Sequence, residues 1–158
     1  MATRLVSRDR DTAVSTPQPG NRLLTYSYDH VAESHLASLR AETQVLLGLW
    51  NVGRDTADSA LLALSELYAN VVTHVPGCRR CTVVLRLRGS VLELRVRDDG
   101  VTVPAIPPDP QAQLLSNEGE SGRGLCLVAA FADRFWFEPV RHRSVLGKTA
   151  VVEWCAAA

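Results

Sequence analysis

The chain has 158 residues, of which 46% are hydrophobic and 22% are charged, and this is the size and composition of a single globular domain. Seventeen Lys and Arg residues balance seventeen Asp and Glu residues, so there is no overall positive field to attract nucleic acid or an anionic membrane. Charged residues interrupt every long apolar run, which argues against a membrane span and predicts a cytosolic protein whose four cysteines are free thiols.

The first twenty residues mix charged and small polar side chains, contain no apolar run suited to a signal peptide, and end in a stretch with two prolines and a glycine. We therefore expect a disordered tail over residues 1–20, followed by one domain over residues 21–158. At the start of that domain, residues 23–28 alternate apolar with polar side chains and should form a strand at a sheet edge.

Two helices are expected next. Apolar residues recur at helical spacing over residues 31–50, and the segment ends before Gly53. A second helix should begin at Asp55 or Thr56, whose short oxygen-bearing side chains suit an N-cap, and should end before Pro76.

The second half of the chain returns to strands. Residues 81–88 and 91–97 alternate around a turn at Gly89-Ser90, which predicts an antiparallel hairpin. Residues 101–121 carry four prolines and read as a lid, with one helical turn from Asp109-Pro110 to Leu115.

A third helix is predicted over residues 122–135, and closing strands over 136–140 and 148–154. This order of elements favours an α+β fold: a two-layer sandwich in which helices cover one face of a mixed, mostly antiparallel sheet.

One polar stripe lies on the second predicted helix. Glu66, Asn70 and His74 are four residues apart, so they share one helix face beside an apolar stripe. A solvated helix face is the ordinary explanation of such a pattern. The functional interpretation is that Asn70 offers a neutral oxygen to Mg²⁺ while Glu66 accepts a proton or positions a water.

Two glycine-containing segments add to this stripe. Asp98-Asp99-Gly100 places a carboxylate at a strand end, where it could accept a hydrogen bond from an exocyclic amine, although such a sequence is also an ordinary turn. Gly122-Arg123-Gly124 opens a helix, and the unpaired amides at a helix N-terminus bind phosphate. Arg123 would add a cation there.

Taken together, these segments resemble the motifs of the GHKL (histidine-kinase-like ATPase) superfamily. Glu66-Leu-Tyr-Ala-Asn70-Val-Val-Thr-His74 resembles its N box, Asp98-Asp-Gly100 its first glycine box, and Gly122-Arg-Gly124-Leu125 its second. The resemblance covers about residues 23–154 and implies a Bergerat-type ATP-binding fold. The short chain is most similar to anti-sigma-factor serine/threonine kinases and their single-domain actinobacterial relatives.

The resemblance implies a role for each matching residue. Glu66 falls at the position of the general base, Asn70 at that of the Mg²⁺ ligand and Asp98 at that of the adenine-reading carboxylate. The positions of close approach fall on Gly100, Gly122 and Gly124, and a further adenine contact falls on Thr149. The first glycine box departs from the pattern, because Thr102 stands where the family has a glycine able to adopt a positive φ.

The activity implied by this resemblance is phosphoryl transfer from ATP, with Mg²⁺, to a Ser or Thr of an anti-sigma-factor antagonist, together with capture of a sigma factor. A homodimer formed through sheet residues is a further implication. The alternative is a protein-interaction module that binds nucleotide only structurally, or has a degenerate pocket, and has no kinase activity.

The remaining motif is a cysteine pair. His74, Cys78 and Cys81 could supply three zinc ligands, but a structural zinc site usually needs a fourth. A redox pair normally opens a helix, whereas this pair leads into a strand. Packing and turn formation are the preferred interpretation of both cysteines.

Overall fold

The computed structural model of the protein describes residues 3–7, 10–15, 21–115, 122–142 and 145–156. Within them one sheet has the strand order β1-β2-β3-β4-β5-β7-β6, and every pairing is antiparallel. The strands are β1 (Thr3–Ser7), β2 (Arg10–Ser15), β3 (Asn21–Tyr28), β4 (Cys81–Arg88), β5 (Val91–Asp98), β6 (Arg134–His142) and β7 (Val145–Cys155).

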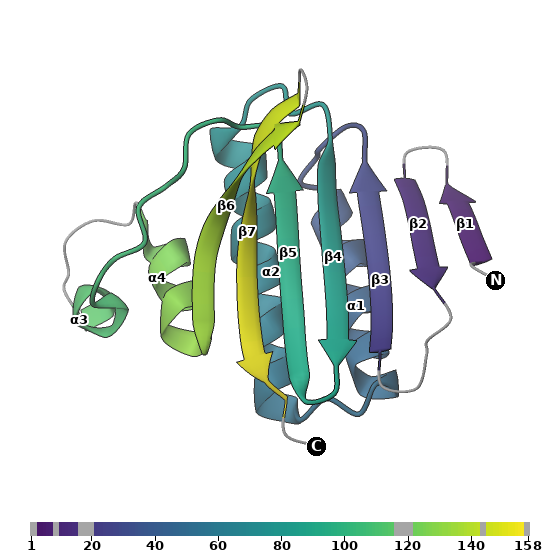
Figure 1. Ribbon diagram of the computed structural model, residues 1–158, viewed down its shortest axis with the longest axis horizontal. Helices are drawn as coiled ribbons and strands as arrows, with labels where there is room; N and C mark the ends of the chain where they lie inside the picture. The colour runs from purple at the N-terminus through teal and green to yellow at the C-terminus, as the bar shows by residue number, and fades with distance from the viewer. Residues whose placement is uncertain (1–2, 8–9, 16–20, 116–121, 143–144, 157–158) are drawn as a thin grey trace.

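The helices form a second layer on one face of the sheet (Figure 1). Helices α1 (His35–Leu49) and α2 (Arg54–His74) lie behind the strands, and α4 (Arg123–Phe131) lies beside α2 near β6. The short helix α3 (Pro110–Leu115) lies beyond α4. This two-layer α+β arrangement confirms the predicted fold class.

Alternation along the strands builds the core and positions a carboxylate at its edge. Leu92, Leu94 and Val96 of β5 are buried on the helix-covered face, against α2 residues such as Leu64. Successive strand residues point to opposite faces, so Asp98 continues the same buried row at the end of β5. Asp98 therefore meets the helix layer rather than solvent.

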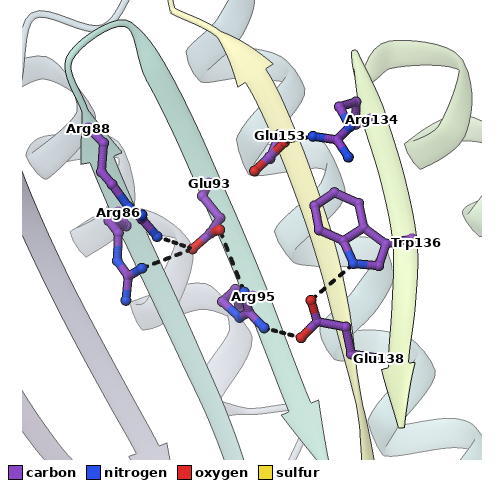
Figure 2. Close-up of polar contacts among 8 residues, drawn as sticks. All are labelled: Arg86, Arg88, Glu93, Arg95, Arg134, Trp136, Glu138 and Glu153. Carbon is purple, nitrogen blue, oxygen red and sulfur yellow. Dashed lines mark hydrogen bonds and ion pairs between the residues drawn. The ribbon is translucent and has the colours of Figure 1, made fainter.

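The opposite face of the sheet is open and carries a network of ion pairs, which Figure 2 shows. Glu93 is buried at its centre, with Arg86 and Arg95 each 3.6 Å away and Arg88 at 3.9 Å. Arg95 continues the network to Glu138. Trp136 also donates to Glu138, and Arg134 both pairs with Glu153 and lies over the Trp136 ring.

Several predicted boundaries differ from the structure. Residues 3–7 and 10–15 form β1 and β2, where we expected a disordered tail; the rest of segment 1–20 lies outside the described residues. Because β2 pairs with β3 over its length, β3 is not the sheet edge. Residues 10–15 form a strand because the backbone of β3 offers them hydrogen-bonding partners. The composition of the N-terminal segment does not reveal this pairing.

The helix ends also differ in detail. Gly53, rather than Asp55 or Thr56, is the N-cap of α2, and Asp55 instead lies in the first turn, where its charge suits the helix dipole. Helix α4 ends at Phe131, because residues from Arg134 onward pair with β7. Arg134 and Phe135, which helical spacing alone assigns to the helix, therefore belong to β6.

Candidate functional site

A cavity of about 850 Å³ opens between α2, the ends of β5 and β7, the loop after β5 and the start of α4. Its size is in the range of small-molecule and cofactor sites. The predicted site residues that line it are Glu66, Asn70, Asp98, Gly100, Gly122 and Gly124, and His74 of the same helix face joins them. Segments far apart in the sequence therefore meet as the motifs implied.

The carboxylate of Glu66 lies against the start of α4. Glu66 and Asn70 are half-buried and one helical turn apart on α2. A Cβ added to Gly124 would overlap Glu66 Oε2, so the absence of a side chain at Gly124 makes room for the carboxylate. Glu66 thus lies beside a helix N-terminus, whose free amides are the kind of donors that can bind an anion.

Gly122 is the N-cap of α4 and has a left-handed conformation, with φ of 92°. A Cβ built there would meet nothing within 4 Å, so its glycine is required by the backbone conformation and not by a close approach. Arg123, the next residue, is exposed and is not among the residues that line the cavity. The predicted cation is therefore not among the residues that form the cavity wall.

Asp98 is buried at the floor of the cavity, where two donors meet one of its oxygens. The amide of Gly100 donates to Asp98 Oδ1 at 2.7 Å, and Lys148 Nζ donates to the same oxygen at 2.8 Å. A Cβ at Gly100 would lie 2.7 Å from Lys148 Nζ and 2.8 Å from Asp98 Oδ1. The absence of a side chain at Gly100 therefore makes room for the Asp98–Lys148 pair.

The structure places Lys148, and not Thr149, at the cavity. In the ladder between β5 and β7, Lys148 is opposite Asp98 and Thr149 is opposite Arg97, so the Thr149 side chain lies on the other face of the sheet. The predicted adenine contact at Thr149 is incompatible with this register. Sequence reasoning missed Lys148 because a shift of one residue exchanges the two faces of a strand.

One signal could have fixed that register. A Cβ at Gly147 would overlap the carbonyl oxygen of Asp98, so Gly147 marks the place where β7 passes the end of β5 at close range. Counting onward from Gly147 places the next side chain, Lys148, beside that of Asp98. The sequence Gly147-Lys148-Thr149 therefore predicts which side chain faces the cavity, but only once β5 is known to be the neighbouring strand.

The loop after β5 shows that Thr102 causes no backbone strain. Among the described residues other than glycine, only Asn51 has a positive φ, so Thr102 has an ordinary backbone conformation. Thr102 lines the cavity with Pro104 and Ala105. The expected cost of a threonine at this position does not arise in this structure.

The predicted helical turn in the lid is present as α3. Asp109 caps it, because its Oδ1 accepts a hydrogen bond from the Ala112 amide at 3.0 Å. Residues 116–121, the last part of the predicted lid, lie outside the described residues.

Cys78 and Cys81 are buried free thiols between α2 and the start of β4. Burial raises the pKa of the Cys78 thiol to about 11, and hydrogen bonding to Asp99 contributes; burial also raises the pKa of Cys81. For Asp99, burial acts to raise the pKa, but hydrogen bonds from Cys78 and from the Arg79 amide outweigh it and the pKa is lowered. These groups stabilise the turn that enters β4.

The chemistry of the lining residues fits a Mg²⁺ nucleotide. Asp98 is an acceptor beside apolar lining residues, the first amides of α4 are donors, and Asn70 supplies a hard oxygen of the kind that Mg²⁺ prefers. Within the described part of the chain, no three His, Cys, Asp or Glu side chains cluster so as to hold a metal by themselves. A Mg²⁺ ion would therefore be held by Asn70 and the phosphates of the nucleotide together.

A two-layer fold with this pocket is that of a nucleotide-binding domain. The sequence matches the model of the histidine kinase-like ATPase domain over residues 31–154, so the chain belongs to that ATP-binding family. No curated protein matches the sequence significantly. None of the helices in the described residues combines the length and apolar character required to cross a membrane.

Proposed function

We propose that this ATP-binding protein is a serine/threonine kinase that phosphorylates an anti-sigma-factor antagonist and sequesters a sigma factor. The observation that carries the proposal is the position of Glu66, whose carboxylate lies against the start of α4 and one turn from Asn70. A general base must lie within reach of the hydroxyl that attacks the terminal phosphate. A carboxylate beside the phosphate-binding helix end meets this requirement.

The other residues divide into binding and charge-stabilising roles. Bound ATP with Mg²⁺ supplies the phosphoryl group and neutralises part of its charge. Asp98 accepts from the exocyclic amine of the base, Asn70 holds the metal, and the amides that follow Gly122 hold phosphate oxygens. Arg123, the exposed first residue of α4, stabilises the charge that develops on the transferred group.

The test is transfer of labelled phosphate from ATP to a purified anti-sigma-factor antagonist by wild type and Glu66→Gln. Glutamine keeps the size of the side chain but accepts no proton, so we expect phosphotransfer to fall by about 10²- to 10⁴-fold. ATP affinity, measured by calorimetry, should stay within about threefold because only the base is removed.

A matched control is Glu33→Gln, the same change at an exposed residue ahead of α1. It should leave both phosphotransfer and ATP affinity at the wild-type level. Unchanged phosphotransfer in Glu66→Gln would remove Glu66 from the mechanism. ATP binding by the wild type without transfer to any antagonist would contradict the kinase proposal and favour a nucleotide-dependent binding module.

A further inference from the structure

The floor of the pocket contains the only lysine of the chain. Lysines and arginines number 17 together, and Lys148 is the single lysine among them. Its side chain is 10% exposed and that of Asp98 5%, so the ion pair between them is shielded from solvent. A compact ammonium, rather than the planar guanidinium used elsewhere in the chain, occupies the place where a base would contact Asp98.

This ammonium keeps donor capacity that points to a ligand. Nζ can donate three hydrogen bonds. The described residues give it one short contact, to Asp98 Oδ1 at 2.8 Å, and one long contact, to the Gly100 carbonyl at 3.5 Å. A buried donor without a good acceptor is costly, and a ligand that brings an acceptor removes that cost.

Apolar side chains flank the pair on the two strands that carry it. Val96 and Ala150 are the next inward-facing residues of β5 and β7, and both line the cavity. Val75 and Phe137 line it as well. This apolar end suits the face of an aromatic ring, with the Asp98–Lys148 pair at the edge of that ring.

Asp98 and Lys148 together present a hydrogen-bond acceptor and a hydrogen-bond donor side by side. Among the described residues both hydrogen bonds to Asp98 use Oδ1, so Oδ2 keeps its lone pairs for a donor of the ligand. Lys148 adds a donor next to it. Adenine has a matching edge, because its 6-amino donor is flanked by the ring-nitrogen acceptors N1 and N7.

We propose that Lys148 is a base-contacting residue that donates a hydrogen bond to the ring nitrogen of adenine on one side of the amino group that Asp98 binds. The inference rests on the ATP site described above and deepens it. A lone carboxylate recognises only the amine, whereas the Asp98–Lys148 pair recognises a donor and its neighbouring acceptor together.

The first test is calorimetric titration of wild type and Lys148→Met with ATP, 1-deaza-ATP and 7-deaza-ATP, in which a carbon replaces N1 or N7. Methionine keeps the length of the side chain and removes the donor. We expect wild type to bind one of the two analogues about tenfold or more weakly than ATP, as for loss of a charged hydrogen bond. Lys148→Met should bind ATP correspondingly weakly and should no longer distinguish that analogue from ATP.

The control is Arg134→Met, which removes a cation from the open face of the sheet, away from the cavity (Figure 2). It should bind all three nucleotides as wild type does. The analogue comparison within wild type does not depend on how well Lys148→Met folds, since the change is then in the ligand.

A second measurement uses wild-type protein labelled with ¹³C-lysine. The single lysine gives one ε-carbon NMR signal, which should shift on saturation with ATP and shift less with the weakly bound analogue. Equal affinity of wild type for all three nucleotides, with an unmoved lysine signal, would overturn this inference while leaving ATP binding intact. Failure of wild type to bind ATP at all would overturn the proposed nucleotide function as well.

Discussion

Gly124 and Gly147 both sit where a Cβ would collide with a neighbour, but the neighbours differ in their freedom to move. At Gly124 the neighbour is Oε2 of Glu66, the far end of a flexible side chain. At Gly147 it is the backbone carbonyl of Asp98, which the β5–β7 ladder holds in place. The same substitution should therefore affect function at one site and stability at the other.

We expect Gly124→Ala to displace the Glu66 carboxylate and slow phosphotransfer by about tenfold, while the free energy of unfolding changes by less than about 1 kcal/mol. Gly147→Ala should lower the free energy of unfolding by about 2–3 kcal/mol, because strand backbone must shift. Chemical denaturation of both variants, beside a phosphotransfer assay, separates the two effects. Equal destabilisation by the two substitutions would contradict this account.

The contrast between Glu66 and Thr149 shows what the sequence could predict of individual site residues. Helical spacing alone fixes which side chains share a face, and Glu66 and Asn70 do line one cavity. On a strand, the same inference needs the pairing partner and its register, which the local sequence does not contain. Thr149 was predicted in place of Lys148 for that reason.

The region between α2 and β4 contains buried groups that keep their protons to higher pH in the folded chain than in the unfolded chain. The pKa of Cys78 is raised from its ordinary value of 9.0 to about 11, chiefly by burial. Burial also raises the pKa values of Cys81 and Tyr68, which lie in the same region of the core. Each of these groups keeps its proton in the folded state at a pH where the unfolded chain releases it.

Stability should consequently be independent of these groups below pH 9 and should fall as the pH rises toward 11. Guanidinium denaturation at a series of pH values measures this as a decreasing midpoint. Cys78→Ala should make the decrease shallower over this interval. Cys155→Ala, at an exposed thiol, should leave its slope unchanged, and identical slopes in wild type and Cys78→Ala would refute the assignment.

Most helices and strands were predictable, because each has its own period and its own terminators. The hairpin of β4 and β5 turns at Gly89-Ser90 as expected, and α2 ends before Pro76. The errors lie where contacts with a segment distant in the sequence determine the secondary structure. Helix α4 stops early because β7 pairs with the following residues, and this tertiary pairing overrides a helical spacing that continues to Phe135.

The molecule has its pocket and its added hairpin at opposite ends of the sheet. Strands β1 and β2 extend the sheet beyond β3, whereas the cavity lies among α2, β5, β7 and α4 (Figure 1). The hairpin covers the backbone edge that β3 would otherwise present to solvent. Its contribution should be to solubility rather than to ligand binding.

Deletion of residues 1–20 should accordingly leave ATP affinity within about twofold of wild type and should increase self-association through the freed edge. Calorimetry and size-exclusion chromatography over a range of concentrations measure the two effects. Val14→Pro removes a backbone donor from β2 opposite Leu24. It should also increase self-association and leave ATP affinity within about twofold of wild type. A large loss of ATP affinity on deletion would show that the two ends of the sheet are coupled.

Strand β7 follows β6 in the chain but lies between β6 and β5, and it brings Lys148 to Asp98 from 50 residues away. Until β7 has left the ribosome, β5 has an unpaired edge and the pocket has no floor. A nascent chain that already contains Glu66, Asn70 and the start of α4 therefore cannot yet hold a nucleotide. Nucleotide binding therefore depends on the pairing of β7 with β5, so a product truncated before β7 would lose its ligand site and the strand that joins β5 to β6 together.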